Sequence, residues 1–301
     1  MNHLKRLTQQ QRRFLIFGKH GQLGNTFNAA FANYKNVLQL SSKDINFLNP
    51  SSISLIINDF KPDFIINTSA YTDVNAAEEN PENAFAINCD ALEVMAKAAR
   101  LNKSVLVHFS TDYIFDGMQN RPYRETDIPN PLNIYGKSKL AGERKVIKSG
   151  CHYFIFRVSW LMSEYGTNFI KTIMSKIAEN KSLSVVDDQI GSPISTNLVS
   201  QITIEILAQN KLVAPKEIFH LSTKGKISWY DIAVQISKVI SNSNKGVIIN
   251  PAKSNQYQSN VKRPMNSLFD HSKVEKNLNN KIPFWIEDIT PIITTLHINK
   301  F

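Results

Sequence analysis

The sequence predicts an α/β fold: a Rossmann-like, doubly wound parallel sheet followed by a smaller C-terminal α/β lobe. Two observations lead to this prediction. Short apolar runs alternate with helical patterns from residue 14 to about residue 160, which indicates a parallel sheet covered by helices on both faces. A glycine-rich turn also stands directly between the first apolar run and the first helical pattern, as it does in many such sheets.

The first half contains five expected strands, each a short apolar run of the kind that is buried on both faces. These strands are Phe14–Phe17, Val37–Leu40, Phe64–Asn67, Val105–Phe109 and Phe154–Phe156. The expected helices are one in which Leu23, Phe27, Ala30 and Phe31 share a face, Pro50–Phe60, Pro81–Leu101 with Ala84, Ile87, Ala91, Met95 and Ala98 on one side, and Tyr135–Ile147. Ser110 and Thr111 follow a strand, and ligands gather at the carboxyl ends of parallel strands.

After residue 160 the alternation is looser. Helical patterns cover 167–178, 196–208 and 228–240, strand-like runs cover 183–186 and 218–221, and the tail from Gly246 is rich in Asn, Ser, Lys and Pro. We therefore expect three parts. They are a basic extension at residues 1–13, a Rossmann domain at 14–160 to which segments near 195–240 return, and a lobe at 161–301 that mainly binds substrate.

The glycine-rich turn has the spacing Gly-x-x-Gly-x-x-Gly. It contains Gly18, Gly21 and Gly24, with Gln22 and Leu23 between the last two. A Cβ atom there would block the tight turn and the approach of backbone amides to a pyrophosphate, which would sit at the positive end of the helix. The turn therefore predicts a dinucleotide site. An ordinary strand-to-helix turn is the alternative that the glycines alone leave open.

Tyr135 and Lys139 are four residues apart, so on a helix they lie one turn apart on one face. The ammonium group is expected to lower the tyrosine pKa from about 10, which makes the phenol a proton donor. With a hydride donor nearby, such a pair reduces a carbonyl group. A surface tyrosine beside a solvated lysine is the alternative.

Composition indicates a globular protein. The chain has 301 residues, of which 42% are hydrophobic, enough for one large domain or two ordinary ones. The most apolar stretch, Tyr153 to Met162, contains Arg157 and is shorter than the roughly 18–20 residues of a membrane helix. The net charge of +10 is spread along the chain without a nucleic-acid motif, which favours a solvated surface that attracts anionic ligands.

Two further features bear on the compartment. Cys89 and Cys151 have neither the number nor the spacing of a disulfide scaffold or metal site, so we expect reduced cysteines and a cytoplasmic protein. The first 13 residues carry four basic side chains and no acid. A short basic extension is the simplest interpretation, with an organellar transit peptide as the alternative.

Several motifs, in one order from residue 14 to about 288, identify a family. They are Gly21–Gly24, Asn67–Val74 with Ala77 and Glu78, Ser110–Gly117, Pro131–Glu143, Arg157–Trp160, Asp188–Pro193 and Arg263–Ser267. Together they closely resemble the dTDP-4-dehydrorhamnose reductases of the extended short-chain dehydrogenase/reductase superfamily. The colinear span is far more specific than any single motif.

The resemblance implies reduction of the C4 keto group of dTDP-4-dehydro-L-rhamnose by NADPH or NADH, the last step of dTDP-rhamnose biosynthesis. By the same resemblance Tyr135 would give a proton to the sugar O4, Lys139 would hold the nicotinamide ribose and Thr111 would polarise the carbonyl. The resemblance assigns to the cofactor also Gly18, Gly21, Gln22, Leu23, Gly24, Asp44, Ile45, Ala70, Tyr71 and Thr72. It assigns to the sugar nucleotide Val74, Thr111, Asp112 and Trp160.

Two departures from the family pattern stand out. Glutamates that help to bind magnesium at a dimer interface in well-known members are matched here by Thr26 and Asn197, which offer no carboxylate. We therefore expect no such metal site, and a monomer or a metal-independent dimer. After Leu40 comes Ser41-Ser42-Lys43 rather than the acidic residue that commonly binds a ribose 2′-hydroxyl, which favours NADPH over NADH.

Two alternative functions stay open. The same residues could reduce another nucleotide-linked 4-keto-6-deoxysugar, or set the opposite C4 configuration. The chain could also be a non-catalytic, dinucleotide-binding regulatory subunit of the kind found in the methionine adenosyltransferase beta subunit. Enrichment in Asn, Lys and Ile is typical of AT-rich microbial genomes, where synthesis of a cell-envelope sugar such as that of lipopolysaccharide fits better.

Overall fold

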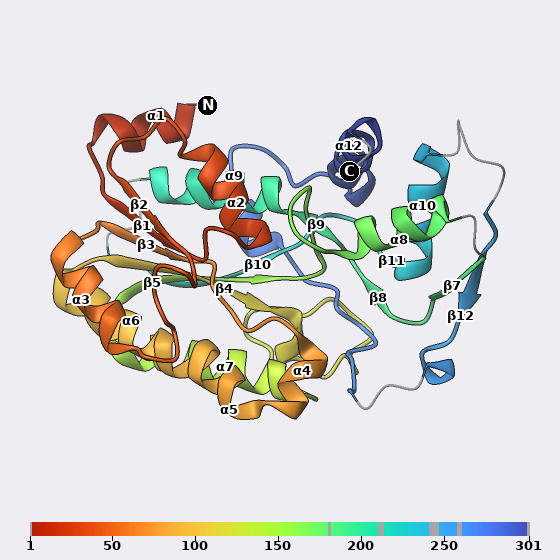
Figure 1. Ribbon diagram of the computed structural model, residues 1–301, viewed down its shortest axis with the longest axis horizontal. Coiled ribbons are helices and arrows are strands. Elements are labelled where there is room, and N and C mark those ends of the chain that lie inside the picture. The colour runs from red at the N-terminus through yellow and green to blue at the C-terminus, as the bar shows by residue number, and fades with distance from the viewer. Residues whose placement is uncertain (1, 180–181, 210–213, 241–246, 258–260, 300–301) are drawn as a thin grey trace.

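A six-stranded parallel sheet forms the larger part of the molecule (Figure 1). The computed structural model describes residues 2–179, 182–209, 214–240, 247–257 and 261–299. The strand order is β10-β5-β4-β3-β1-β2, with β1 Phe14–Phe17, β2 Val37–Leu40, β3 Phe64–Asn67, β4 Val105–Thr111, β5 His152–Val158 and β10 Lys216–Leu221. The order reverses between β1 and β3, which places the expected ligand crevice beyond their carboxyl ends. The predicted fold class is confirmed.

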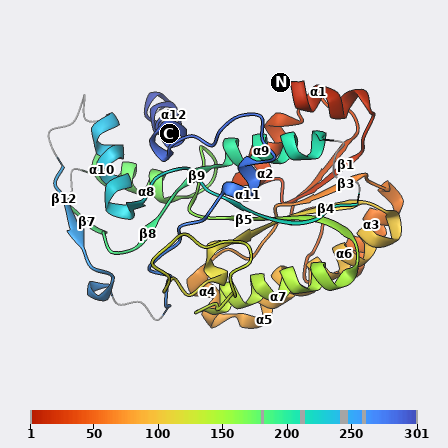
Figure 2. The ribbon, with the colours of Figure 1, turned by 180° about the vertical axis from the view of Figure 1, so that it is seen from behind.

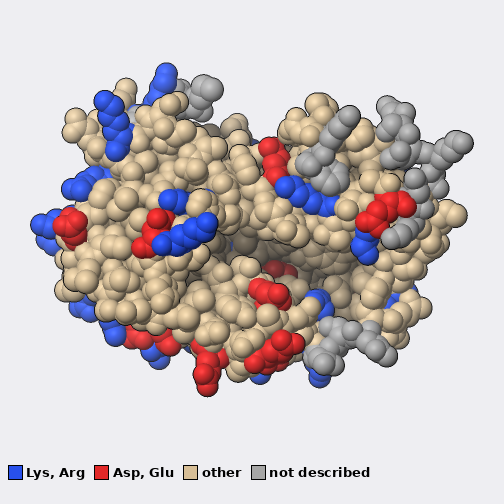
Figure 3. All heavy atoms as spheres, viewed as in Figure 1, with Lys and Arg blue, Asp and Glu red and all other residues tan. Residues whose placement is uncertain are grey.

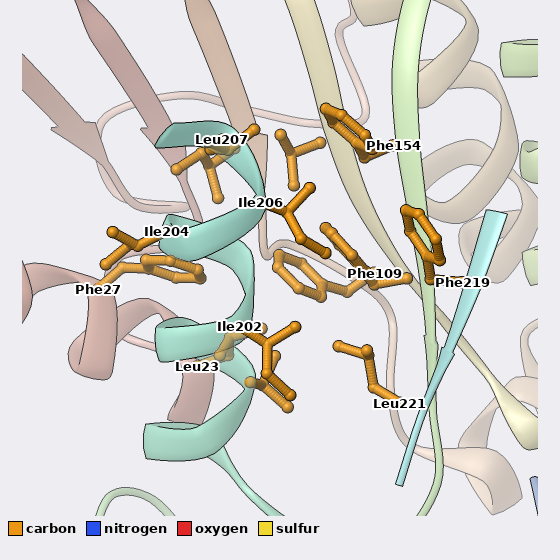
Figure 4. Packing of buried hydrophobic residues seen from close by; sticks show 14 of the residues in the cluster. Leu23, Phe27, Phe109, Phe154, Ile202, Ile204, Ile206, Leu207, Phe219 and Leu221 are labelled. Carbon is orange, nitrogen blue, oxygen red and sulfur yellow. The ribbon is translucent and has the colours of Figure 1, made fainter. Parts of the chain in front are cut away.

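Three helices cover one face of the sheet: α1 (Asn2–Gln9), α2 (Gln22–Ala30) and α9 (Thr196–Ala208), and the short α11 (Ser272–Glu275) adds to the same core. Figure 4 shows Phe27 of α2 and Ile206 of α9 packed beside Phe109 of β4. The first residues, expected only as a basic extension, form a helix because Leu4 and Leu7 share one face. Leu7 is 1% exposed and packs into this core.

The opposite face is covered by α3 (Ser51–Phe60), α6 (Ala91–Asn102) and α7 (Ile134–Ser149). The single helix predicted from Pro81 to Leu101 is wrong in one respect. It is divided into α5 (Pro81–Phe85), a π-helical turn (Ala86–Asp90) and α6, and α4 (Val74–Glu79) precedes it. The π turn aims Asn88 at the backbone of Tyr71 and at the Ser138 hydroxyl of α7, 2.9 Å away.

The second lobe contains α8 (Phe169–Ala178), α10 (Trp229–Ile240) and α12 (Trp285–Ile298), which enclose their own apolar core. The parallel pair β7 (Leu183–Val186) and β12 (Ile249–Ala252) lies at its far edge, as Figure 2 shows from behind. Short pairs join the lobes: β6 (Leu161–Met162) with β9 (Ile194–Ser195), and β8 (Ile190–Gly191) with β11 (Ile227–Ser228). Helix α12 was not expected in the Asn- and Ser-rich tail. It forms because Ile289, Ile292, Ile293 and Leu296 share a buried face.

In the part of the chain that the structure describes, no helix has both the length and the apolar character to cross a bilayer. Cys89 and Cys151 are buried free thiols. Burial raises the pKa of Cys89 to about 11 and also raises that of Cys151, so neither forms the reactive thiolate readily.

Candidate active site

A cavity of about 660 Å³ opens at the carboxyl ends of the sheet strands and reaches the second lobe. Figure 3 shows the hollow on the face seen in Figure 1. Most of the residues predicted for the site line this cavity: Gly18, Gly21, Gln22, Leu23, Ala70, Thr72, Val74, Thr111, Asp112, Tyr135, Lys139 and Trp160. Segments far apart in the sequence therefore meet at one place.

The glycine turn closes one end of the cavity. Gly18 has a φ of +89°, and a Cβ atom there would lie 2.7 Å from the Ser69 nitrogen and the Thr68 hydroxyl. No side chain caps the first turn of α2 at Gly21, so its amide groups can bind a phosphate. Gly24 has another function. A Cβ atom on it would lie 1.9 Å from the Gly18 carbonyl, so this glycine lets the helix pack against the turn.

Four predicted cofactor residues lie outside the lining: Gly24, which packs the helix against the turn, and Asp44, Ile45 and Tyr71. Asp44 accepts hydrogen bonds from the Ser41 amide and hydroxyl, both 2.7 Å, and pairs with Lys19 at 3.1 Å. The Ser41 bonds, with Lys19, lower the pKa of Asp44 to about 2. Ile45 is buried in the core below the sheet, and the Tyr71 amide donates to Asn88. These residues shape the walls, whereas Ser41 and Ser42 line the cavity directly.

Helix α7 brings Tyr135 and Lys139 to the cavity wall. Its N-cap Asn133 accepts a hydrogen bond from the Gly136 amide at 2.8 Å. A Cβ atom on Gly136 would lie 2.1 Å from the Tyr113 carbonyl, so glycine allows the helix to approach the turn after β4. The Tyr135 ring then meets the Tyr113 ring edge to face, with centroids 5.6 Å apart.

The predicted effect of Lys139 on the Tyr135 pKa is wrong for this structure. Withdrawal from solvent raises the Tyr135 pKa above its ordinary value, the Thr111 hydroxyl opposes the rise, and the Asp112 and Tyr113 charges add to it. The Lys139 amine is turned instead toward the Phe109 carbonyl, 2.6 Å away. The phenol therefore keeps its proton at neutral pH and has one to donate.

Lys139 is 2% exposed, and burial lowers its pKa from 10.5 to about 8 against the opposing charge of Glu143. Its nitrogen also lies 3.3 Å from His108 Nε2. Among the described residues, no carboxylate forms an ion pair with it. A buried amine without a carboxylate partner has a proton that is easily lost.

Thr111 and Asp112 form a polar corner at the end of β4. The Thr111 hydroxyl donates to Asp112 Oδ1 at 3.1 Å and accepts from the Tyr113 amide at 3.2 Å. Burial raises the pKa of Asp112 to about 6. Asp112 Oδ2 and the Ser110 hydroxyl are buried in the cavity lining without a partner among the described residues, so both can bind a polar ligand.

Trp160 is held between two surfaces. Trp229 stacks on it, with ring centroids 3.8 Å apart and 16° between the planes. A Cβ atom on Gly191 would lie 2.5 Å from Trp160 Cε2 and 2.8 and 2.9 Å from its bonded neighbours Cζ2 and Cδ2, a position over the ring face. The three atoms nearest to that Cβ position all belong to Trp160 and none to Trp229. Trp229 therefore covers the face of Trp160 that is turned away from Gly191. Trp160 therefore meets the cavity with its edge, at a left-handed φ of +48°.

The two positions expected to lack metal-binding carboxylates lie apart from the cavity lining. Thr26 is 6% exposed, and its hydroxyl donates to the Thr196 hydroxyl at 2.8 Å. Asn197 is exposed on α9. Within the described ranges, no three His, Cys, Asp or Glu side chains gather where they could hold a metal ion.

Sequence reasoning missed part of the lining: His20, Phe47, Thr68, Ser69, Ile87, Phe109, Tyr113, Val158, Leu161, Gly166, Thr167 and Trp229. Ser69 and Tyr113 stand beside predicted residues at strand ends, so their position was a usable signal. Trp229 had none, because it begins a helix of the second lobe that only the folded chain brings against Trp160.

Residues 12–298 match the family model described as RmlD substrate binding domain. The dTDP-4-dehydrorhamnose reductase of Aggregatibacter actinomycetemcomitans is 36% identical, over 88% of this chain and 92% of that protein. The crystal structure of a dTDP-4-dehydrorhamnose reductase from Clostridium acetobutylicum has a TM-score of 0.87 at 30% identity, covering 94% and 99% of the two chains. That of the Bacillus anthracis enzyme in complex with NADP has a TM-score of 0.84 at 32% identity, covering 96% and 99%.

Proposed function

This chain belongs to the RmlD substrate binding domain family, that of the dTDP-4-dehydrorhamnose reductases, and on that premise we propose that it reduces the C4 keto group of dTDP-4-dehydro-L-rhamnose with NADPH or NADH. The product is dTDP-L-rhamnose. The single observation that carries the proposal is the meeting of Thr111, Tyr135 and Lys139 in one cavity with the glycine turn at its end.

The reaction needs one hydride and one proton. The reduced nicotinamide supplies hydride to C4 when it is bound, and the Tyr135 phenol gives its proton to the carbonyl oxygen, which becomes the C4 hydroxyl. Thr111 turns its hydroxyl from Asp112 to that oxygen and polarises the carbonyl. Because burial raises the Tyr135 pKa, the phenol is fully protonated when the reaction begins.

The cavity fits a dinucleotide along the sheet lobe. We assign the pyrophosphate to the glycine turn and the uncapped first turn of α2, and the nicotinamide ribose to Lys139, which lines the same cavity. Ser41 and Ser42 line the cavity beyond β2, and Asp112 is the only carboxylate in the described lining. Asp44 lies beside Ser41, but its carboxylate is bonded to the Ser41 amide and hydroxyl and paired with Lys19. The Ser42 hydroxyl in the lining suits a 2′-phosphate, so we favour NADPH.

The sugar nucleotide then lies toward the second lobe. We propose that the sheet lobe binds the dinucleotide and that the second lobe mainly binds the substrate. Val74, Asp112 and the edge of Trp160 are the contacts assigned to it. Both faces of the Trp160 ring are covered, so the indole offers an edge rather than a stacking surface.

The test is NADPH consumption with dTDP-4-dehydro-L-rhamnose by the wild-type protein and by Tyr135→Phe, with the product's C4 configuration determined by NMR. We expect Tyr135→Phe to lose about 10²–10⁴-fold in kcat. Tyr123→Phe is the matched control, because Tyr123 is buried but bonds Asp116 outside the cavity lining. Comparing NADPH with NADH in the same assay tests the cofactor preference.

Three outcomes would contradict the proposal. Turnover that gives the opposite C4 configuration would point to another deoxysugar product. Equal activity of Tyr135→Phe and wild type would remove the tyrosine from the chemistry. Tight NADPH binding without turnover of the keto sugar would favour a regulatory dinucleotide-binding subunit or another substrate.

A further inference from the structure

A buried hydrogen-bond chain lies beneath the cavity, behind Lys139. His108 of β4 is 1% exposed, and its two ring nitrogens face different partners. Nδ1 lies 3.2 Å from Asn67 Nδ2, and Nε2 lies 3.3 Å from Lys139 Nζ. Asn67 and His108 stand side by side in the register of β3 and β4.

The orientation of the Asn67 amide is set by Ser69. The Ser69 backbone amide donates to Asn67 Oδ1 at 3.1 Å, and the Ser69 hydroxyl donates to the same oxygen at 2.5 Å. A backbone N–H can only donate, so it requires the oxygen on its side. The Asn67 NH₂ group must therefore face His108.

This orientation decides which nitrogen of His108 carries the proton. Nδ1 receives a hydrogen bond from Asn67 and must have a free lone pair. A cationic imidazole is excluded because it would present a second donor there. The neutral ring then carries its proton on Nε2, and Nε2–H points at the Lys139 nitrogen.

A protonated amine cannot accept that bond, because an ammonium group has three donors and no lone pair. A neutral amine accepts it from His108 and still donates to the Phe109 carbonyl. Hydrogen bonds in the chain are fully matched only when Lys139 is neutral. If Lys139 holds its extra proton, two donors face each other.

We propose that His108 is a positioning residue that orients the Lys139 amine and favours its neutral form through an Nε2–H···Nζ hydrogen bond. Lys139 then gains and loses its proton within the working pH range instead of being a permanent positive charge. Burial acts in the same direction. The charge of Glu143, on the same helix, acts on the amine, and Tyr135, Asp112 and Tyr113 are titratable groups of the same described cavity lining.

A second buried histidine supplies an internal control. His220 also lies beside a buried cation, but Arg157 Nη1 can only donate to His220 Nε2, 3.3 Å away. His220 Nδ1 is 2.9 Å from the Tyr123 carbonyl, which can only accept. The same reasoning therefore gives His220 the opposite tautomer, with its proton on Nδ1.

The decisive measurement is ¹⁵N NMR of the full-length protein labelled at histidine, recorded as a function of pH. We expect two imidazoles that stay neutral across the range, one protonated at Nε2 and one at Nδ1. His220→Gln should remove the Nδ1–H signals and leave the Nε2–H signals. A buried pair that are both Nδ1–H tautomers, or a His108 that becomes cationic, would overturn the proposal.

The activity arm uses His108→Gln and rests on the proposed reductase function, whereas the NMR arm does not. A glutamine amide can turn its oxygen to the Lys139 ammonium, so the variant should bind that proton about tenfold more tightly. We therefore expect the alkaline limb of the kcat/KM profile to move up by about one pH unit. His220→Gln should keep the wild-type limb. An unchanged or lowered limb in His108→Gln would refute the role, and if that variant fails to fold, the wild-type NMR spectrum still decides.

Discussion

Two buried cations of this protein, each beside a buried histidine, have opposite surroundings. Arg157 is 3% exposed and binds Glu143 through Nε and Nη2, with its shortest contact at 2.8 Å. Its Nη1 group points to His220 and the Glu125 carbonyl, so each of the three guanidinium nitrogens meets an acceptor. Lys139 is 2% exposed, bonds a carbonyl and a histidine, and lines the cavity with no carboxylate partner in the described parts of the chain.

The difference separates a structural charge from a reactive one. A buried ion pair with matched hydrogen bonds holds its protons firmly and fixes the elements that carry it. A buried amine without a carboxylate has a lowered pKa and can exchange its proton. Helix α7 contains residues of both environments, four positions apart. Tyr135 and Lys139 face the cavity, whereas Glu143 anchors the helix to Arg157 of β5.

The largest effect is expected from Lys139→Met. Activity should fall about 10²–10⁴-fold, because the amine that we propose holds the nicotinamide ribose is gone. Stability at pH 7 should rise by up to about 3 kcal/mol, the difference between pKa values of 10.5 and about 8. That gain exists below pH 8, where the buried amine must be charged, and disappears above pH 10.5. Urea unfolding at both pH values measures it.

Lys137→Met is the matched control for that variant, since Lys137 is exposed on the same helix. It should leave both the activity and the pH dependence of unfolding close to wild type. If Lys139→Met lost as much stability as a broken ion pair, the proposed contrast between the two cations would not hold.

Glu143→Gln tests the other cation. The variant leaves Arg157 charged, buried and without its carboxylate, so we expect a loss of about 3–5 kcal/mol of unfolding free energy. Urea titration at pH 7 measures it. Removing both charges with Glu143→Leu and Arg157→Met should recover much of the loss, because an apolar pair needs no hydrogen bonds. A double variant as unstable as the single one would show that packing, not charge, dominates there.

Asp112 extends the comparison to a buried acid for which the described residues provide no ion-pair partner. Burial raises its pKa from 3.8 to about 6, so the folded state prefers the protonated form. The contribution of Asp112 to the free energy of unfolding is fully present below pH 3.8. It is lost as the pH rises through 6, a change of about 3 kcal/mol. Asp112→Asn should therefore gain about 3 kcal/mol over wild type between pH 4 and pH 7. Parallel pH profiles of the two proteins would argue that the carboxyl is already ionised in the folded state.

Local sequence patterns were sufficient for the sheet, the glycine turn and the positions of Thr111, Tyr135 and Lys139, because each depends on periodicity or on a motif. They could not pair residues brought together by tertiary packing. Arg157 and Glu143 were noted in two separate family motifs, and Arg157 also as a charge in an apolar stretch, but nothing in the sequence paired them, because they lie on different elements. The direction of the Tyr135 pKa shift failed for the same reason, because burial and the Lys139 bond to Phe109 are properties of the folded chain.

The smallest effect is expected from Glu93→Gln, which repeats the Glu143 substitution at the surface. Glu93 of α6 pairs with Lys97 at 2.7 Å and with Lys145 of α7 at 2.6 Å, but the lysine side chains are 66% and 41% exposed. Solvent screens these pairs, so we expect a loss of about 0.2–1 kcal/mol that disappears in 1 M salt, where the Debye length is about 3 Å. Both glutamates bind a cation and both tie α7 to a neighbour. A loss at Glu93 as large as at Glu143 would mean that tethering α7, rather than burying a charge, sets the cost.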